Sequence, residues 1–117
     1  MQPYRNLEVW RRAHRLALEV YRLTSAFPES ERFGLTSQAR RAAASIPANI
    51  AEGSVRSPNE YRHHLRISLG SAAELDYHLL LAADLGLLES NTHQTFEKEL
   101  DEIKRMLFSL QQAVGRK

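Results

Sequence analysis

The chain has 117 residues, 43% hydrophobic and 26% charged. It is long enough for one globular domain over residues 1–117, and its composition excludes a disordered or collagen-like chain. The absence of cysteine excludes disulfides, thiolate metal ligands and cysteine nucleophiles. No apolar run approaches the roughly 18 residues of a membrane span, and the first ten residues lack the apolar centre of a signal peptide. We therefore expect a cytoplasmic protein without membrane association.

The net charge of +2 is unevenly distributed along the chain. Residues 1–66 contain eleven Arg, no Lys and six acidic residues, whereas residues 67–117 contain five basic and eight acidic residues. Thirteen of the sixteen basic residues are Arg, whose forked guanidinium suits phosphate contacts. Two explanations stay open at this point: the codon usage of a GC-rich genome, or a surface selected to bind a polyanion.

Helical spacing of apolar residues runs through the chain, and no segment has the sustained alternation typical of a strand. Breaks at Pro28, at residues 53–58 and at Gly86 divide the chain into four predicted helices. They cover about residues 6–26, 35–52, 58–85 and 91–114. Four helices joined by short turns predict an all-α fold, an antiparallel up-down-up-down four-helix bundle.

The first predicted helix is apolar on more than one face. Its main stripe consists of Val9, Ala13, Leu16, Ala17, Val20 and Leu23. A second patch widens the apolar arc: Leu7, Trp10, His14, Leu18 and Tyr21. Arg11, Arg15 and Arg22 lie opposite the main stripe, where neighbouring glutamates allow ordinary surface ion pairs.

The second predicted helix carries small apolar residues, which permit close packing. We expect Pro47 to bend this helix without ending it, because proline removes the hydrogen bond to the Ala43 carbonyl. Gly53 is the predicted C-cap. A polar stripe runs beside the apolar face: Gln38, Arg41, Ser45, Asn49 and Glu52.

The polar stripe has two interpretations. It is either a buried hydrogen-bond network that fixes the register of the helices, or a binding surface for RNA or a peptide. Arg40 and Arg41 fit the network poorly, because an unpaired guanidinium is costly to bury.

The third predicted helix has clear boundaries, with Ser57 as N-cap, Pro58 in the first turn, Glu60 completing a capping box, and Gly86 as C-cap. It is apolar on two faces. One carries Tyr61, Leu65, Ala72, Leu75, Leu79 and Ala83; the other carries Ile67, Gly70, Leu81 and Leu85. The helical wheel does not decide which face packs within the chain. The fourth predicted helix has a single apolar stripe, as expected of an outer helix.

These surplus apolar residues predict a homo-oligomer, because a monomeric bundle needs one apolar stripe per helix. Burying one large apolar side chain stabilises an assembly by roughly 1.5–3 kcal/mol. We predict subunit contacts at Leu7, Trp10, His14, Leu18, Tyr21, Ile67, Gly70, Leu81 and Leu85.

The sequence predicts neither an enzyme nor a metal or cofactor site. A di-metal centre in a four-helix bundle needs two Glu-x-x-His motifs and two further glutamates. Glu60 and His63 form the only such motif, and Glu60 is already assigned to helix capping. The sequence suggests no Ser-His-Asp set and contains no Gly-rich phosphate loop.

Residues 33–53 resemble the signature of the 23S rRNA intervening-sequence protein family, also called S23 or four-helix bundle proteins. The matching runs are FGLTSQARRAA at 33–43 and SIPANIAEG at 45–53, with LEVW at 7–10, AH at 13–14, LGSAAEL at 69–75 and LG at 85–86. The resemblance covers essentially the whole chain and implies a four-helix bundle that assembles as a homopentamer.

Members of this family include reading frames inside intervening sequences of bacterial 23S rRNA genes. The family is also similar to the accessory proteins of diversity-generating retroelements, which are basic pentamers that act with a reverse transcriptase and RNA. The resemblance implies no enzymatic activity.

Three functions stay open. The first is a non-enzymatic oligomeric module that binds structured RNA or DNA, largely independently of base sequence. Its predicted phosphate contacts are Arg11, Arg12, Arg15, Arg40, Arg41, Arg62 and Arg66. The second is a protein-interaction adaptor, for example for a reverse transcriptase, which the modest net charge favours. The third is a passenger of a mobile insertion with no biochemical task.

Overall fold

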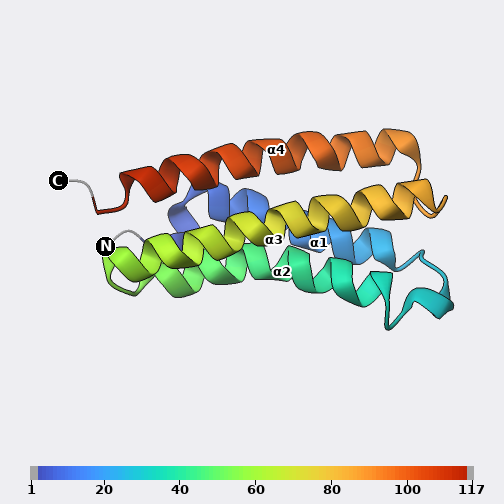
Figure 1. Cartoon of the computed structure of the whole chain (residues 1–117), viewed down its shortest axis with the longest axis horizontal. Coiled ribbons are helices and arrows are strands. Elements are labelled where there is room, and N and C mark those ends of the chain that lie inside the picture. The colour runs from blue at the N-terminus through green and yellow to red at the C-terminus, as the bar shows by residue number, and fades with distance from the viewer. Residues whose placement is uncertain (1–2, 116–117) are drawn as a thin grey trace.

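The computed structural model describes residues 3–115, which form four α-helices and two short 3-10 helices. The α-helices are α1 (Glu8–Thr24), α2 (Leu35–Ser54), α3 (Pro58–Asp84) and α4 (Ser90–Ala113); η1 (Tyr4–Asn6) precedes α1, and η2 (Glu29–Glu31) follows it. Within residues 3–115 there is no strand. Consecutive helices run antiparallel in a bundle of 48 × 24 × 20 Å (Figure 1), which confirms the predicted all-α four-helix bundle. No helix of the described part has a stretch long and apolar enough to cross a membrane.

All four helices contribute to one hydrophobic core. Its largest fully buried side chains are Leu16, Ile46, Ile50, Leu65, Leu75, Leu79, Leu100, Ile103 and Leu107. The core face of α3 is therefore the one that carries Leu65, Leu75 and Leu79. On the opposite face, Ile67 is exposed. The choice between two similar apolar faces depends on the neighbouring helices, which a helical wheel does not contain.

The predicted boundaries of α3 are confirmed in detail. The Ser57 Oγ accepts a hydrogen bond from the Glu60 backbone N–H at 3.3 Å, and the Glu60 carboxylate accepts from the Ser57 N–H and hydroxyl at 3.3 and 3.0 Å. These hydrogen bonds lower the pKa of Glu60. At the other end Gly86 has a φ of 80°, and the Leu87 N–H donates to the Ala82 carbonyl. That bond is the 6→1 bond of a Schellman cap.

The prediction that Gly53 caps α2 is wrong. The helix passes through Pro47 without a break, as expected, and continues to Ser54, and φ at Gly53 is not positive. Gly53 instead allows α2 and α3 to approach each other closely. A Cβ at this position would lie 2.7 Å from the His64 Cβ and 2.9 Å from the Tyr61 Cδ1. The glycine therefore serves packing between helices, not the end of one.

Candidate nucleic-acid interface

Three of the seven predicted phosphate-contacting arginines are held by the chain itself. Arg12 forms a forked ion pair with Glu99, with Nη2–Oε1 and Nε–Oε2 distances of 2.7 and 3.0 Å. The Arg12 Nη1 also lies 3.9 Å from the Glu102 Oε1. The hydrogen bonds to Glu99 raise the pKa of Arg12 above its usual value. Arg62 donates to the Val114 carbonyl at 2.6 Å and to the Asn59 side chain. Arg12 and Arg62 thus join α4 to α1 and α3.

The third held arginine, Arg40, is fixed without a carboxylate. Its Nε donates to the Thr24 hydroxyl at 2.8 Å and its Nη2 to the Tyr21 carbonyl at 3.2 Å, at the C-terminal end of α1. Its guanidinium also lies 4.8 Å from the centre of the Tyr21 ring. In residues 3–115 no acidic side chain pairs with Arg40, so its position is fixed while no carboxylate neutralises its charge.

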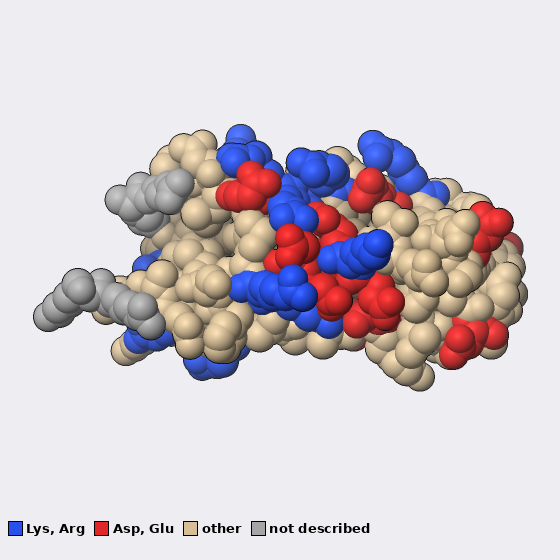
Figure 2. Space-filling model, turned by 90° about the horizontal axis from the view of Figure 1, so that it is seen from above, with Lys and Arg blue, Asp and Glu red and all other residues tan. Residues whose placement is uncertain are grey.

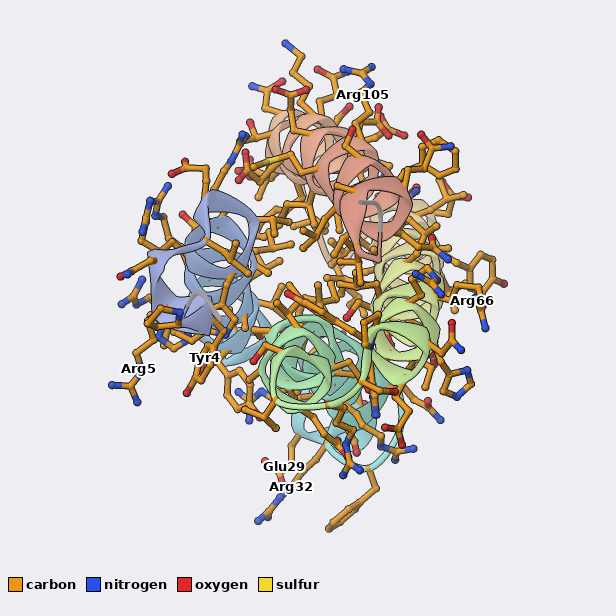
Figure 3. All side chains as sticks on the ribbon, turned by 90° about the vertical axis from the view of Figure 1, so that its left-hand side faces the viewer. Tyr4, Arg5, Glu29, Arg32, Arg66 and Arg105 are labelled. Carbon is orange, nitrogen blue, oxygen red and sulfur yellow. The ribbon has the colours of Figure 1, made fainter. Side chains whose placement is uncertain are left out.

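The other four predicted contacts lie on three different helices. Arg11 pairs with Glu8 at 3.0 Å on the surface of α1, an interaction of the kind that contributes little to stability. Arg15, Arg41 and Arg66 are exposed and form no ion pair within the described residues. Figure 3 shows Arg66 projecting outward from α3. On the face that carries α4, basic and acidic side chains interleave (Figure 2), so that face offers no purely basic surface.

Three arginines line one pocket of about 680 Å³ whose lining includes no acidic residue; we call it the arginine pocket. It lies along the N-terminal half of α2 and the turn before it. Its lining is Tyr21, Arg32, Phe33, Thr36, Ser37, Arg40, Arg41, Ala44, Ser45 and Ala48. The lining thus contains three arginines, two aromatic rings and no carboxylate.

Two residues of this pocket were missed among the predicted contacts. Arg32 projects away from the bundle next to Glu29, its partner in an exposed ion pair at 3.4 Å (Figure 3). Phe33 is 88% exposed, and the Arg32 guanidinium lies 5.3 Å from the centre of its ring. Phe33 opens the signature segment of the sequence, but an apolar residue there gives no sign that it faces water.

Three members of the polar stripe of α2, Ser45, Asn49 and Glu52, form a network of polar contacts with α3. The Ser71 hydroxyl donates to the Ser45 hydroxyl at 2.8 Å, and the Asn49 amide donates to the same oxygen at 3.0 Å. The Asn49 Oδ1 lies 2.9 Å from the His64 Nδ1, and the His64 Nε2 lies 3.8 Å from a Glu52 oxygen. These three residues therefore contact α3 as the first interpretation of the stripe expects, although Ser45 and Asn49 are half-buried and Glu52 is exposed.

The two remaining members of the polar stripe lie outside this network. Gln38 and Arg41 are exposed, and Arg41 lines the arginine pocket. The stripe is therefore divided: its C-terminal half connects α2 to α3, and its N-terminal half faces solvent.

The four predicted subunit contacts on α1, Trp10, His14, Leu18 and Tyr21, line an apolar groove of about 380 Å³, which we call the α1–α2 groove; Leu7, which precedes α1, does not line it. Its lining is Tyr4, Trp10, His14, Ala17, Leu18, Tyr21, Ala44, Pro47, Ala48 and Ala51. Trp10 stacks on His14 with ring centres 5.0 Å apart. Leu18 and Tyr21 are 43% and 45% exposed, whereas Leu7 and Trp10 pack partly against the core.

The predicted contacts on α3 are less uniform. Ile67, Gly70 and Leu85 are exposed, but Leu81 is half-buried against the core of its own chain. Other large exposed apolar side chains were not predicted as contacts: Tyr77, Leu80 and Phe108.

One group of side chains has the composition of a metal site. Ligand atoms of Asp76, His93 and Glu97 lie within 4.8 Å of one another between α3 and α4. The Lys104 ammonium lies 3.2 Å from Asp76 Oδ2, so this carboxylate is already paired with a cation of the chain itself. Glu60, which completes the capping box of α3, is not part of this group.

Comparison with known proteins agrees with this architecture. The family model for the 23S rRNA-intervening sequence protein matches residues 5–109. A crystal structure of a protein of unknown function from the S23 ribosomal protein family of Bacteroides thetaiotaomicron superposes with a TM-score of 0.81 at 24% identity, over 89% of this chain and 95% of that one. None of the curated proteins compared with the chain matches it. With the family model spanning nearly all of its length, the chain belongs to the 23S rRNA-intervening sequence protein family.

Proposed function

We propose that the chain is a non-enzymatic, homo-oligomeric module that binds nucleic acid through the arginine pocket, with little dependence on base sequence. The observation that carries the proposal is that Arg32, Arg40 and Arg41 line one pocket whose lining has no carboxylate, and that of the three only Arg32 forms an ion pair within residues 3–115, with Glu29 outside the lining. Phosphate contacts supply most of the sequence-independent affinity for nucleic acid. No element of the bundle has the form of a base-reading motif, so discrimination between sequences should be weak.

Arg40 contributes a pre-organised charge to this pocket. Its Nε and Nη2 are engaged by Thr24 and by the end of α1, while the N–H groups on Nη1 have no partner among residues 3–115. A phosphate that accepts from Nη1 therefore meets a guanidinium that needs little further ordering. Arg41 and Arg32 are exposed and can adjust to the backbone of the ligand.

The α1–α2 groove supports the oligomeric part of the proposal. It borders the arginine pocket, since Tyr21, Ala44 and Ala48 line both. A second copy of the chain seated on the groove would cover Leu18 and Tyr21 and place several arginine pockets on one particle. Linked sites raise the overall affinity for a long polyanion well above that of a single pocket.

The same groove favours a second candidate function, a protein-interaction adaptor. Its lining is apolar apart from His14 and the hydroxyls of the tyrosines, which suits an apolar segment of a polypeptide such as a reverse transcriptase. In this alternative the groove binds another polypeptide, and the arginines only attract that polypeptide electrostatically as it approaches.

A titration with labelled nucleic acid tests the proposal. We expect structured RNA and duplex DNA to bind at micromolar protein in about 50 mM salt and to bind much more weakly in about 200 mM salt, because each neutralised phosphate adds about −0.9 to the slope of log K against log salt for duplex DNA. Failure to bind either ligand, or binding that does not respond to salt, would contradict it. A pull-down that recovers a protein but no nucleic acid would favour the adaptor.

A further inference from the structure

We propose that the arginine pocket takes an unpaired nucleotide, with the base stacked on Phe33 and the phosphate held by Arg41 and Arg40. The module would then prefer single-stranded segments, such as the loops of a folded RNA, to a duplex. This inference rests on the proposed function and names its substrate class.

The position of Phe33 is the first reason. It is 88% exposed, more than any other large apolar side chain in residues 3–115, although the next apolar residue, Leu35, is buried. Phe33 contributes nothing to the core and lies between η2 and α2, so helix packing does not account for it. A ligand that covers this exposed phenyl ring removes apolar surface from water, which favours binding.

The surroundings of the ring are the second reason. The Arg32 guanidinium lies over the ring, 5.3 Å from its centre, and the Phe33 side chain is still 88% exposed, so a base can reach the ring. Every base has a π-face, so an aromatic platform beside arginines binds single strands with little preference for sequence. Aromatic rings and arginines combined in one groove are the usual composition of single-strand sites.

The size of the pocket is the third reason. The pocket is an open depression of about 680 Å³, a volume large enough to take a nucleotide. Ser37, which is half-buried, also lines the pocket and carries a hydroxyl that can bind a sugar or a base edge. Arg41, which has no ion pair within residues 3–115, is available to the phosphate.

A duplex cannot use this platform without cost. Each of its bases is already stacked on both sides and paired at its edge, so a base must be unstacked before it reaches Phe33. Duplexes would therefore bind through their phosphates alone. Single strands would gain the stacking contact as well, which is worth roughly five- to one-hundredfold in affinity per base.

The test compares affinities of the full chain for a labelled oligouridine strand and for a labelled RNA duplex of equal length. Phe33→Ala is the main variant and Phe33→Tyr, which keeps a ring, is its conservative counterpart. Phe108→Ala is the matched control, because Phe108 is also an exposed phenylalanine (53%) but lies on α4, outside the pocket.

We expect the unmodified chain to prefer the single strand. Phe33→Ala should lower single-strand affinity by about tenfold and leave duplex affinity and its salt dependence unchanged, while Phe33→Tyr and Phe108→Ala should bind as the unmodified chain does. Equal losses for both ligands, or no loss for either, would overturn the stacking while leaving salt-dependent binding intact. A change in assembled mass for Phe33→Ala would overturn it too, by placing Phe33 at a subunit contact. If no ligand binds the unmodified chain, the proposed function itself has failed.

Discussion

Replacing Gly53 with alanine is expected to destabilise the fold by about 1–3 kcal/mol, as over-packing of a tight contact usually does. The added Cβ would lie 2.7 Å from the His64 Cβ and 2.9 Å from the Tyr61 Cδ1. The first of these atoms is fixed to the backbone of α3, so the two helices must separate. Their separation would also disturb the hydrogen bond between Asn49 and His64.

Gly70 provides the matched control. It also lies in a helix, but a Cβ at this position would meet nothing within 4 Å. Gly70→Ala should therefore raise stability by up to about 1 kcal/mol, since alanine favours the helix more than glycine does. Urea unfolding followed by circular dichroism, at one protein concentration, measures both variants. Similar changes in the two urea midpoints would contradict the claim that Gly53 is needed for the close packing of α2 against α3.

Leu18→Glu is expected to convert the proposed oligomer into a monomer that keeps its fold. Leu18 is 43% exposed in the single chain, so a glutamate there is tolerated by the isolated bundle. In a subunit contact through the α1–α2 groove, the same carboxylate would be buried without a partner, which is strongly unfavourable. Trp10 and Leu81 are poorer sites for this test, because both pack partly against the core of their own chain.

Leu80→Glu is the control for this experiment. Leu80 has the same exposed fraction, 43%, but lies on α3 outside the groove. Light scattering coupled to size-exclusion chromatography should give a monomer mass for Leu18→Glu and the mass of the unmodified assembly for Leu80→Glu. The groove would lose its assigned role if Leu18→Glu kept the assembled mass, or if the unmodified chain were monomeric.

The fold was predictable because its determinants are local. Helical periodicity and the break at Pro28 separate the helices, and the side chain of Ser57 and the positive φ of Gly86 act within one turn of their own helix. Gly53 shows where local reasoning fails. It stands where a C-cap is common, but its reason lies on another helix, in contacts with Tyr61 and His64.

The candidate site was only partly predictable, because pairing and exposure are properties of the folded chain. Arg12 and Arg41 look alike in the sequence, yet Arg12 meets Glu99, 87 residues away, and Arg41 meets no acidic residue within residues 3–115. Phe33 resembles a core residue until the turn that carries it is seen to face solvent. The resemblance marked the segment that lines the arginine pocket but did not distinguish the residues in it that pack in the core from those that face solvent.

The binding claim is tested most directly by two charge-matched double variants. Arg32→Gln with Arg41→Gln removes two positive charges from the arginine pocket, and Arg15→Gln with Arg66→Gln removes two exposed positive charges from outside it. Affinity for the same labelled RNA strand is measured at several salt concentrations. We predict that the pocket variant loses about tenfold or more in affinity, and that its salt slope becomes shallower by about 1.4 because two phosphate contacts of about 0.7 each are lost. The outer variant should lose far less. Equal losses in the two variants, or an unchanged affinity in the pocket variant, would contradict the assignment of nucleic-acid binding to this pocket.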